Sequence, residues 1–440
     1  MKKEQMDEHY QRDATHVIFP NGKISPGNNA ISIVRGNGIY LFDNLGNKYT
    51  DGISGLINVN VGYARRDLNL AATEAMDLGY STIFFGRSHI FAENLAMKLA
   101  KITPDGIEYF FFTLSGSDAN DAAFRLVRCC NVARGLPGKM KILARTGSYH
   151  GATLATMSAG GETARHIGMG IRMPGFVNVS QPRPGFDAIS ELRDIIKREG
   201  AETIAAFIGE PVAYQAGMIV PPGDYWKQVR DICTENQIVL IIDEVLTGFG
   251  RTGKMFAIEH WGISPDIITL SKGLTSGYLP LGAFGISDKY HAQVLSALGS
   301  SEGILGFTGT GHPASCAVAI KNLEIIETQA LVKNAYSMGI YLAKKLSAMQ
   351  SRSQYISGSR VLGLLAGIDV QTKEHADAAS NSTFCSHIVE LLKQRRIFLR
   401  SFNTTIALAP PLIISRSEID EICAAIETAI DEIGDMFHHD

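Results

Sequence analysis

The sequence predicts an α/β fold built around a mostly parallel central sheet. Several short runs of apolar residues, each bounded by turn residues, are separated by longer segments with helical periodicity. Strands that are apolar on both faces and spaced by helices are typical of a parallel sheet covered on both sides. The predicted strands are residues 109–112, 141–143, 204–209, 238–243, 266–270 and 282–286.

The two ends of the chain predict a second, smaller unit of α+β type. In "GIYLFDNLGNKYTDGISG", residues 38–55, apolar residues alternate around the turn signal Asn44-Leu45-Gly46, which indicates an antiparallel hairpin. The C-terminal part mixes helical stretches with the strand-like runs "LGLLAGIDV" and "ALAPPLI". We therefore expect a large domain over residues 66–329 and a smaller domain assembled from residues 1–65 and 330–440.

Composition gives no reason to expect nucleic acid or a membrane as a partner. The chain has 440 residues and a formal net charge of -3, and no stretch approaches the roughly 20 apolar residues that a membrane span requires. The polar N-terminus has no apolar run behind its two lysines, so we expect no signal peptide. The six cysteines show neither metal-site spacing nor a disulfide framework, which favours a cytoplasmic protein with reduced thiols.

The stretch "LIIDEVLTGFGRTGKMF", residues 240–256, raises the alternative of nucleotide binding, because its glycines match the dinucleotide fingerprint G-x-G-x-x-G. That fingerprint has to follow its strand directly, whereas residues 244–247 intervene after the strand that ends at Asp243. The phosphate-loop pattern fails as well, because Met255 stands where a magnesium-binding Ser or Thr is needed. We interpret the glycines as a loop after a strand.

Polar and reactive residues follow the predicted strands at the edge where ligands of open α/β sheets bind. Asp243 ends one strand, and Glu210 and Lys272 follow two others. Tyr149 and His150 follow a fourth strand, and the serines and glycines of "LSGSDAN" follow the strand "YFFF". The sequence therefore predicts a reactive site at this edge.

Pyridoxal phosphate is a cofactor that would use this whole set. It needs an amine to bond to its aldehyde, an acid opposite its ring nitrogen and an anion site for its phosphate. Lys272 can supply the amine, Asp243 the acid, and the helix start at Ser115, Gly116 and Ser117 the phosphate site. Taken singly, each has an ordinary alternative: a surface lysine, a turn acid or a serine that caps a helix.

Longer segments then match one known family, in that family's order. They are "FFTLSGSDANDAAFRLVR", "GSYHGATLATMSAGG", "GEPVAYQAGMIVPPGDYW", "IIDEVLTGFGRTG", "PDIITLSKGLTSGYLPLGA", "GFTGTGHPASCAVA" and "LAPPLIIS". From about residue 40 to 415 the chain thus resembles the class III, pyridoxal-phosphate-dependent aminotransferases, the omega-aminotransferase group. The resemblance implies the fold type I of pyridoxal-phosphate-dependent transferases, with a large domain and a smaller α+β domain from both chain ends.

The resemblance implies catalytic roles for Lys272, which bonds to the cofactor, and Asp243, which pairs with its ring nitrogen. Val245 and Tyr149 would contact the two faces of the ring. Thr308 matches a threonine that reaches the phosphate from the neighbouring subunit, which implies a homodimer, or a dimer of dimers, with active sites at the interface. The expected cofactor-binding residues are Ser115, Gly116, Ser117, Tyr149, His150, Glu210, Asp243, Val245, Lys272 and Thr308.

For the substrate, Arg400 matches an arginine that binds the carboxylate in many family members, because a planar guanidinium pairs with both carboxylate oxygens. A solvated surface arginine is the alternative. Three positions depart from the amine-accepting members: Ile57 replaces a tryptophan, Gln215 a small residue and Gly309 a tyrosine. These changes should reshape the pocket. The expected substrate-binding residues are Arg400, Ile57, Phe85, Tyr149 and Gln215.

The activity implied is transfer of an amino group from an amine or omega-amino acid to a keto acid such as pyruvate, by a ping-pong mechanism. The chain is similar to amine:pyruvate and taurine:pyruvate enzymes in particular. An aminomutase or a decarboxylase on the same fold is the alternative, and neither would need a second substrate. A binding protein without catalysis is disfavoured, because Lys272, Asp243 and Ser117 are intact.

Overall fold

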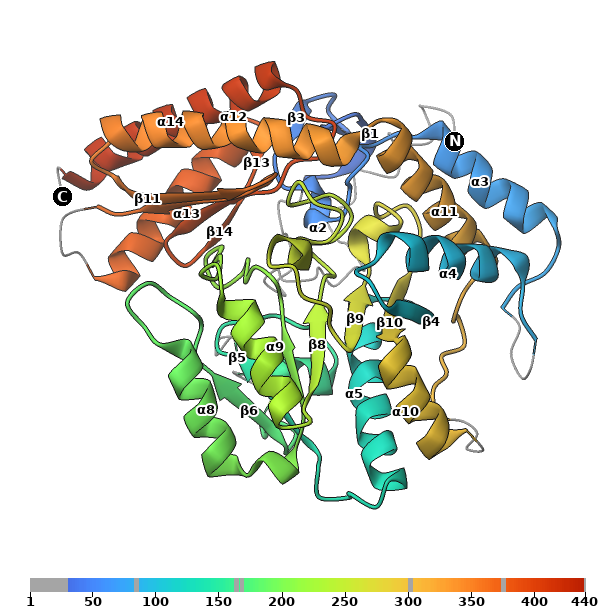
Figure 1. The fold of residues 1–440 in the computed structure, drawn as a ribbon. Helices are drawn as coiled ribbons and strands as arrows, with labels where there is room; N and C mark the ends of the chain where they lie inside the picture. The colour runs from blue at the N-terminus through green and yellow to red at the C-terminus, as the bar shows by residue number, and fades with distance from the viewer. Residues whose placement is uncertain are drawn as a thin grey trace.

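The computed structural model describes residues 31–82, 87–161, 166, 170–299, 304–372 and 377–438. Within these residues, no helix has the length and apolarity that crossing a membrane requires. Figure 1 shows the large sheet with its helices in the lower half, and above it the N-terminal strands, in blue, near the C-terminal helices, in orange and red.

The large sheet has seven strands in the order β4-β10-β9-β8-β7-β5-β6. Its strands are β4 (Ile107–Thr113), β5 (Lys141–Arg145), β6 (Phe176–Val179), β7 (Ile204–Gly209), β8 (Val239–Asp243), β9 (Ile267–Leu270) and β10 (Gly282–Ser287). The pairs from β6 through β9 are parallel, and β10 runs antiparallel to both β9 and β4. The predicted α/β fold with a mostly parallel sheet is confirmed. The sequence did not predict β6, a short strand that contains the polar Asn178.

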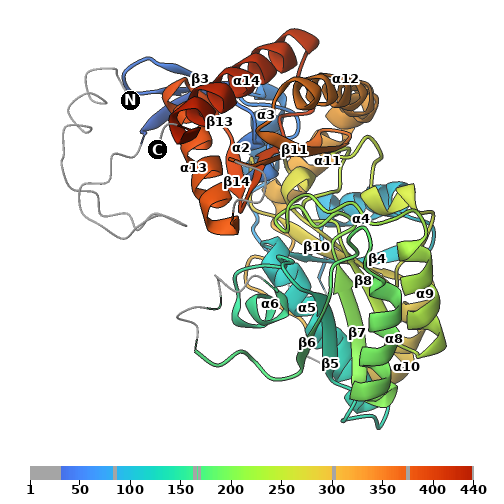
Figure 2. The ribbon, with the colours of Figure 1, turned by 90° about the vertical axis from the view of Figure 1, so that its left-hand side faces the viewer.

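Successive residues of a strand point to opposite faces of the sheet. Both faces of this sheet are buried, because helices cover each of them. Leu143, Phe207 and Leu240 pack on one face with α8 (Ala188–Glu199) and α9 (Tyr225–Glu235). Ile142 and Ile208 pack on the other face with α5 (Gly116–Ala133) and α10 (Asp288–Leu298). Figure 2 shows α5 and α8 on opposite sides of the strands. The helices between residues 66 and 328 are α3 (Arg66–Asp77), α4 (Ile90–Ile102), α5 (Gly116–Ala133), α6 (Leu154–Ala159), α8 (Ala188–Glu199), α9 (Tyr225–Glu235), α10 (Asp288–Leu298) and α11 (Pro313–Thr328).

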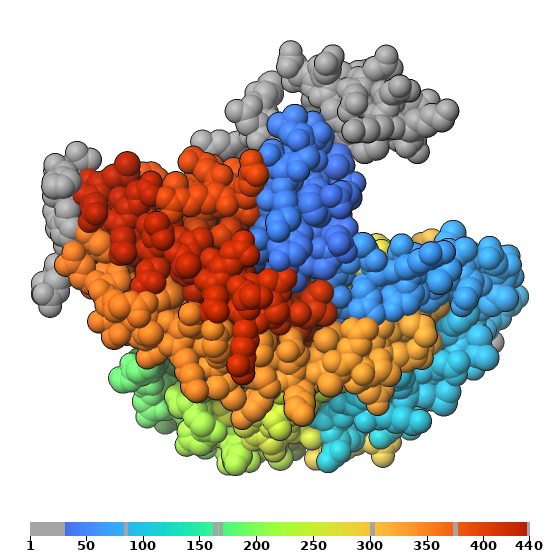
Figure 3. Space-filling view, turned by 90° about the horizontal axis from the view of Figure 1, so that it is seen from above, coloured from blue at the N-terminus to red at the C-terminus, as the bar shows by residue number. Residues whose placement is uncertain are grey.

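The two ends of the chain share a sheet. The predicted hairpin is present as β2 (Tyr40–Asp43) and β3 (Lys48–Asp51), with β1 (Ile33–Asn37) on its outer side. On the other side β3 pairs in parallel with the C-terminal strand β13 (Ile397–Phe398). Figure 3 accordingly shows N-terminal residues, in blue, against C-terminal residues, in red. This pairing agrees with a small domain made from both ends, although the bounds 1–65, 66–329 and 330–440 stay predictions.

The C-terminal part carries a second small sheet, with the order β11-β12-β15-β14. Its strands are β11 (Ile356–Leu362), β12 (Leu365–Val370), β15 (Thr405–Leu408) and β14 (Arg400–Phe402), and its helices are α12 (Leu331–Arg352), α13 (Ala378–Gln394) and α14 (Arg416–His438). Residues of the three helices and of β11, β12 and β15 share one apolar cluster with α11. The candidate site is lined by residues at the carboxyl ends of the large sheet's strands and by Leu56 and Asn58 from the N-terminal part of the chain.

Candidate active site

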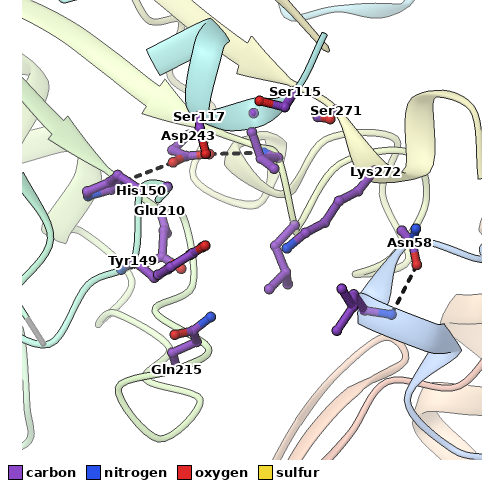
Figure 4. A pocket seen from close by; sticks show the side chains of 15 residues that line it. Asn58, Ser115, Ser117, Tyr149, His150, Glu210, Gln215, Asp243, Ser271 and Lys272 are labelled. Carbon is purple, nitrogen blue, oxygen red and sulfur yellow. Dashed lines mark hydrogen bonds and ion pairs between the residues drawn. The ribbon is translucent and has the colours of Figure 1, made fainter. Parts of the chain in front are cut away.

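A cavity of about 230 Å³ lies at the carboxyl ends of β5, β7, β8 and β9. It is lined by Leu56, Asn58, Ser115, Gly116, Ser117, Tyr149, His150, Gly151, Glu210, Gln215, Asp243, Val245, Leu246, Ser271 and Lys272. Most of the residues that the sequence predicted for the site are among them. Figure 4 shows Lys272 reaching into the space between Asp243 on one side and Gln215 on the other.

Lys272 stands just after β9 at the start of a short 3₁₀ turn, with a φ of 45°. A left-handed backbone is unfavourable for a residue with a side chain and is found at sites where the surrounding structure enforces it. Desolvation by the protein lowers the pKa of the Lys272 ammonium to about 8, an effect that the carboxylates of Asp243 and Glu210 oppose. Near neutral pH the side chain therefore holds an appreciable fraction of the neutral, nucleophilic amine.

Asp243 ends β8 with its carboxylate buried and fully oriented by neighbours. The Oδ2 atom accepts hydrogen bonds from His150 Nδ1 at 2.8 Å and from Asn120 Nδ2 at 2.9 Å. The Oδ1 atom accepts one from the backbone N–H of Val245 at 3.1 Å. A buried carboxylate held by donors in this way offers a fixed negative charge to a cationic ring nitrogen.

Glu210 follows β7 and is also buried. The backbone N–H of Tyr149 donates to its Oε1 atom at 3.3 Å, and the Arg145 guanidinium donates to its backbone carbonyl. Burial raises the pKa of the Glu210 carboxyl, and the nearby Asp243 charge raises it further. Glu210 is thus an acid that holds its proton more readily than an exposed glutamate.

Helix α5 points its N-terminus at the cavity. Ser115 is its N-cap: its Oγ atom accepts the backbone N–H of Asp118 at 3.2 Å, so the ordinary capping role holds. The Oγ atom of Ser117 accepts the N–H of Ala152 at 3.0 Å and ties the helix to the loop after β5. Free N–H groups at a helix start attract phosphate.

These residues fit pyridoxal phosphate by the chemistry of their donor set. The cavity brings together an amine, a buried carboxylate and a helix N-terminus, which complement an aldehyde, a pyridinium and a phosphate. A Cβ atom on Gly116 would lie 2.7 Å from Val245 Cγ1, so only glycine lets the helix start approach this side chain. Val245 and Tyr149 are both among the lining residues.

Three of the predicted residues that the structure describes are not among the cavity lining, and a fourth lies outside the described residues. Among the described residues, the part of the wall that comes from the N-terminal segment is Leu56 and Asn58, whereas Ile57 is buried and does not line the cavity. Arg400 begins β14 with its guanidinium 5.5 Å from the Phe402 ring centre, and its charge lowers the pKa of Lys272 from nearby. The remaining two are Thr308, which is exposed in the single chain, and Phe85, which lies outside the described residues.

Sequence reasoning missed Asn120, the second side chain that holds Asp243. It also donates to the backbone carbonyl of His150 at 2.7 Å, so a single amide fixes both partners. A signal for it existed, because Asn120 comes four residues after Gly116 and thus lies on the same face of α5. Leu56 and Asn58 carried no such signal, since the backbone around them turns irregularly.

The glycines after β8 form a loop, as the sequence predicted. Glu244 turns away from Asp243 and accepts the Thr247 hydroxyl at 2.5 Å and the Ile258 N–H at 2.7 Å. Gly250 and Gly253 adopt left-handed φ angles of 91° and 80°. The glycines therefore allow the loop to fold back on the buried Glu244.

The amino-acid sequence of this chain matches one known protein family. A family model described as aminotransferase class-III matches residues 24–430. The putrescine–pyruvate aminotransferase of Pseudomonas aeruginosa is 34% identical over 91% of this chain and 90% of its own length. The taurine–pyruvate aminotransferase of Bilophila wadsworthia is 32% identical over 92% of this chain and 93% of its own length.

Solved structures agree with the sequence comparison. A transaminase from the marine bacterium Virgibacillus superposes with a TM-score of 0.91 at 37% identity, covering 98% of this chain and 99% of its own. An (S)-enantioselective omega-transaminase from Thermomicrobium roseum gives a TM-score of 0.89 at 36% identity, covering 95% of this chain and 96% of its own. The fold and the sequence thus point to the same group of proteins.

Proposed function

The chain belongs to the class III aminotransferase family and is a pyridoxal-phosphate-dependent transaminase, and we propose that it moves an amino group from an amine or omega-amino acid to pyruvate. The observation that carries the proposal is the meeting of Lys272, with its lowered pKa, and the fixed Asp243 carboxylate in one cavity. Two relatives whose names specify pyruvate support the choice of acceptor.

In this proposal Lys272 has two tasks. Its neutral amine would hold pyridoxal phosphate through the aldehyde group of the cofactor. As a general base, the same amine would take the proton from the donor's amine-bearing carbon and hold it on Nζ, which a pKa near 8 suits because general bases work best near the operating pH. Bound pyridoxal phosphate supplies an electron-withdrawing ring that stabilises negative charge on that carbon.

The remaining lining residues hold and orient the cofactor in the proposed site. Asp243 keeps the ring nitrogen protonated, and its hydrogen bonds to His150 and Asn120 prevent the carboxylate from turning away. The helix start at Gly116 and Ser117 binds the phosphate. Val245 and Tyr149 would contact the cofactor ring, and Glu210 is held beside Tyr149 by the backbone N–H of that residue.

Substrate recognition is proposed to involve Arg400 and Gln215. Arg400 lies close enough to affect Lys272 electrostatically, and a guanidinium pairs well with the carboxylate of a keto acid. Gln215 forms part of the cavity lining on the side facing away from Asp243. Ile57 is buried and lies between Leu56 and Asn58 in the chain, and it would affect the pocket through these two lining residues.

We propose that the working form is a homodimer or a dimer of dimers located in the cytoplasm. Exposed Thr308 would complete the phosphate site of a partner subunit, as its family resemblance implies. All six cysteines are free thiols, which supports a reducing compartment. The variant Thr308→Ala tests this role. Sedimentation measures its assembly and cofactor titration measures its affinity for pyridoxal phosphate, each compared with the wild type.

The absorbance spectrum of the bound cofactor tests the reaction. The purified protein is loaded with pyridoxal phosphate, mixed with taurine, beta-alanine, putrescine or 1-phenylethylamine, and then given pyruvate. We expect one donor or more to convert the cofactor to pyridoxamine phosphate and pyruvate to reverse the change. Conversion of an amine to product without any need for pyruvate would instead indicate an aminomutase or a decarboxylase.

A further inference from the structure

A short hairpin between β7 and α9 forms one wall of the cavity. Ala213 and Ile219 exchange two backbone hydrogen bonds of 3.0 Å each, which closes its base. Inside it the carbonyl of Tyr214 accepts the N–H groups of Gly217 at 3.2 Å and Met218 at 2.8 Å. The tip of this 213–219 hairpin carries Gln215 into the active-site cavity.

The tip of the 213–219 hairpin also borders a second cavity. Ala216 and Gly217 line a space of about 480 Å³ whose other walls include Arg183 and residues of the C-terminal sheet. Gln215 belongs to the first cavity and its two successors to the second, so the tip is a partition between them.

Arg360, on β11, holds the tip from the C-terminal sheet. Its Nη2 atom donates to the carbonyl of Gly217 at 2.6 Å and its Nε atom to the carbonyl of Met218 at 3.2 Å. Asp369, on β12, accepts from both Nη atoms of the same guanidinium, with 2.8 Å between Nη2 and Oδ1. The Thr405 hydroxyl in turn donates to that Oδ1 atom at 2.6 Å, which orients the carboxylate.

The held tip is not in a relaxed conformation. Met218 has a left-handed φ of 55°, which costs free energy for a residue with a side chain. Its carbonyl and that of Gly217 are two of the acceptors that the Arg360 fork satisfies, and charge-assisted hydrogen bonds of this kind are strong. The ring of Tyr214 packs edge-on against Phe402 at 5.5 Å and holds the base.

We propose that Arg360 is a positioning residue that sets the length limit of the amine donor by fixing the 213–219 hairpin as the end wall of the cavity. The inference rests on the proposed function, because it assigns the wall of that same site. With the guanidinium removed, the tip loses both of its anchors on β11, and a longer donor can displace Gln215 toward the second cavity. Chemistry at Lys272 is unaffected.

The test compares donor-length profiles of holoenzymes. Values of kcat/KM are measured with pyruvate for unbranched primary amines from propylamine to octylamine. For Arg360→Ala we expect the octylamine to propylamine ratio to rise by about tenfold or more, since one methylene at a pocket wall alters selectivity by that order. Gln215→Gly, which removes the wall side chain and keeps the fork, should shift the ratio in the same direction.

Arg352→Ala is the matched control, because Arg352 also pairs with a carboxylate, Glu427, but on the surface. Hydrogen exchange of the 213–219 segment gives a readout without turnover and should quicken in Arg360→Ala alone. An equal fall in kcat/KM for amines of every length in Arg360→Ala, with unchanged hydrogen exchange of the 213–219 segment, would overturn the proposal. If Arg360→Ala does not fold, an unchanged length profile in Gln215→Gly overturns it. Failure of the proposed function can be told apart from failure of this proposal, because the wild-type enzyme would then convert no amine of any length.

Discussion

Asn120 and Asp243 are 123 positions apart in the sequence, yet the Asn120 amide donates to the Asp243 carboxylate at 2.9 Å inside the protein. The same amide nitrogen donates to the carbonyl of His150, whose ring holds the same carboxylate oxygen. Three chain segments are thereby fixed at one point: the start of α5, the loop after β5 and the end of β8. The Asp243 carboxylate is thus held in one orientation by side chains from the two other segments.

Asn120→Ala should therefore weaken catalysis without preventing folding. The Asp243 carboxylate would lose one of its two Oδ2 donors and gain freedom to rotate, and loss of one preorganised hydrogen bond costs about 10²-fold in kcat. The dissociation constant of pyridoxal phosphate, measured by fluorescence, should rise together with the loss of kcat.

Asn131→Ala is the matched control for that variant, since Asn131 is a buried asparagine of the same helix whose amide donates to the carbonyl of Lys139 at 2.9 Å. It should lose stability and keep its cofactor affinity. Equal dissociation constants for pyridoxal phosphate in the two variants would show that the hydrogen bond from Asn120 to Asp243 does not contribute to cofactor binding.

Lys272→Ala should abolish transamination, by more than about 10⁴-fold, because the site then lacks both the bonding amine and the general base. Lys272→Arg should be equally inactive, since arginine keeps the charge and never offers a neutral amine near neutral pH. Turnover of either variant at the wild-type rate, measured with pyruvate and any accepted donor, would refute the role of this residue.

The lowered pKa of Lys272 also predicts how the rate of pyridoxal phosphate uptake by cofactor-free protein depends on pH. Its ammonium pKa falls from 10.5 to about 8, so the neutral amine that attacks an aldehyde forms as the pH rises through about 8. The rate of pyridoxal phosphate uptake, followed by stopped-flow absorbance, should rise with pH and level off above that value. A midpoint near 10.5 would mean that the cavity does not desolvate the lysine.

The sequence predicted the architecture because the strands are apolar on both faces. The run 204–209 coincides with β7, whose six residues are all buried, and the hairpin signal around Gly46 lies between β2 and β3. Lys272, Asp243 and the α5 start were predictable because residues at carboxyl ends of parallel strands meet at one edge.

What could not be predicted depends on contacts between distant segments and on local backbone geometry. The choice of Leu56 and Asn58 over Ile57 as cavity wall follows from left-handed φ angles of 64° at Gly55 and 61° at Ile57, which redirect the side chains. The Arg360 fork joins positions 142 and 143 residues apart, and no periodicity in the sequence encodes such a pairing.

Glu244 predicts a pH dependence of stability that is separate from catalysis. Burial raises the pKa of its carboxyl from 4.5 to about 7, so the folded protein keeps a proton that the unfolded chain releases. The linked stability is fully present below about pH 4.5 and is lost as the pH rises through about 7. Glu244→Gln, which cannot ionise, should become more stable relative to the wild type by on the order of 1–3 kcal/mol between pH 5 and pH 8.

Urea unfolding of the two proteins at several pH values measures that difference. Glu327→Gln controls for the substitution itself, because the Glu327 side chain is 74% exposed. A constant difference between Glu244→Gln and the wild type across this range would mean that Glu244 is ionised in the folded protein at all of these pH values.

Arg400→Ala should separate the two half-reactions. Without the guanidinium, a keto-acid carboxylate loses a bidentate partner, whereas an uncharged amine donor loses only packing. We expect the kcat/KM for pyruvate to fall by about 10- to 100-fold, and the rate of cofactor conversion by 1-phenylethylamine in the absence of pyruvate to change by less than about threefold. Arg400 is half-buried beside Phe402, so Arg400→Met keeps most of the apolar stem and isolates the effect of charge. Equal losses in both half-reactions would place Arg400 among the residues that support the fold, and carboxylate binding would then have to involve another cation.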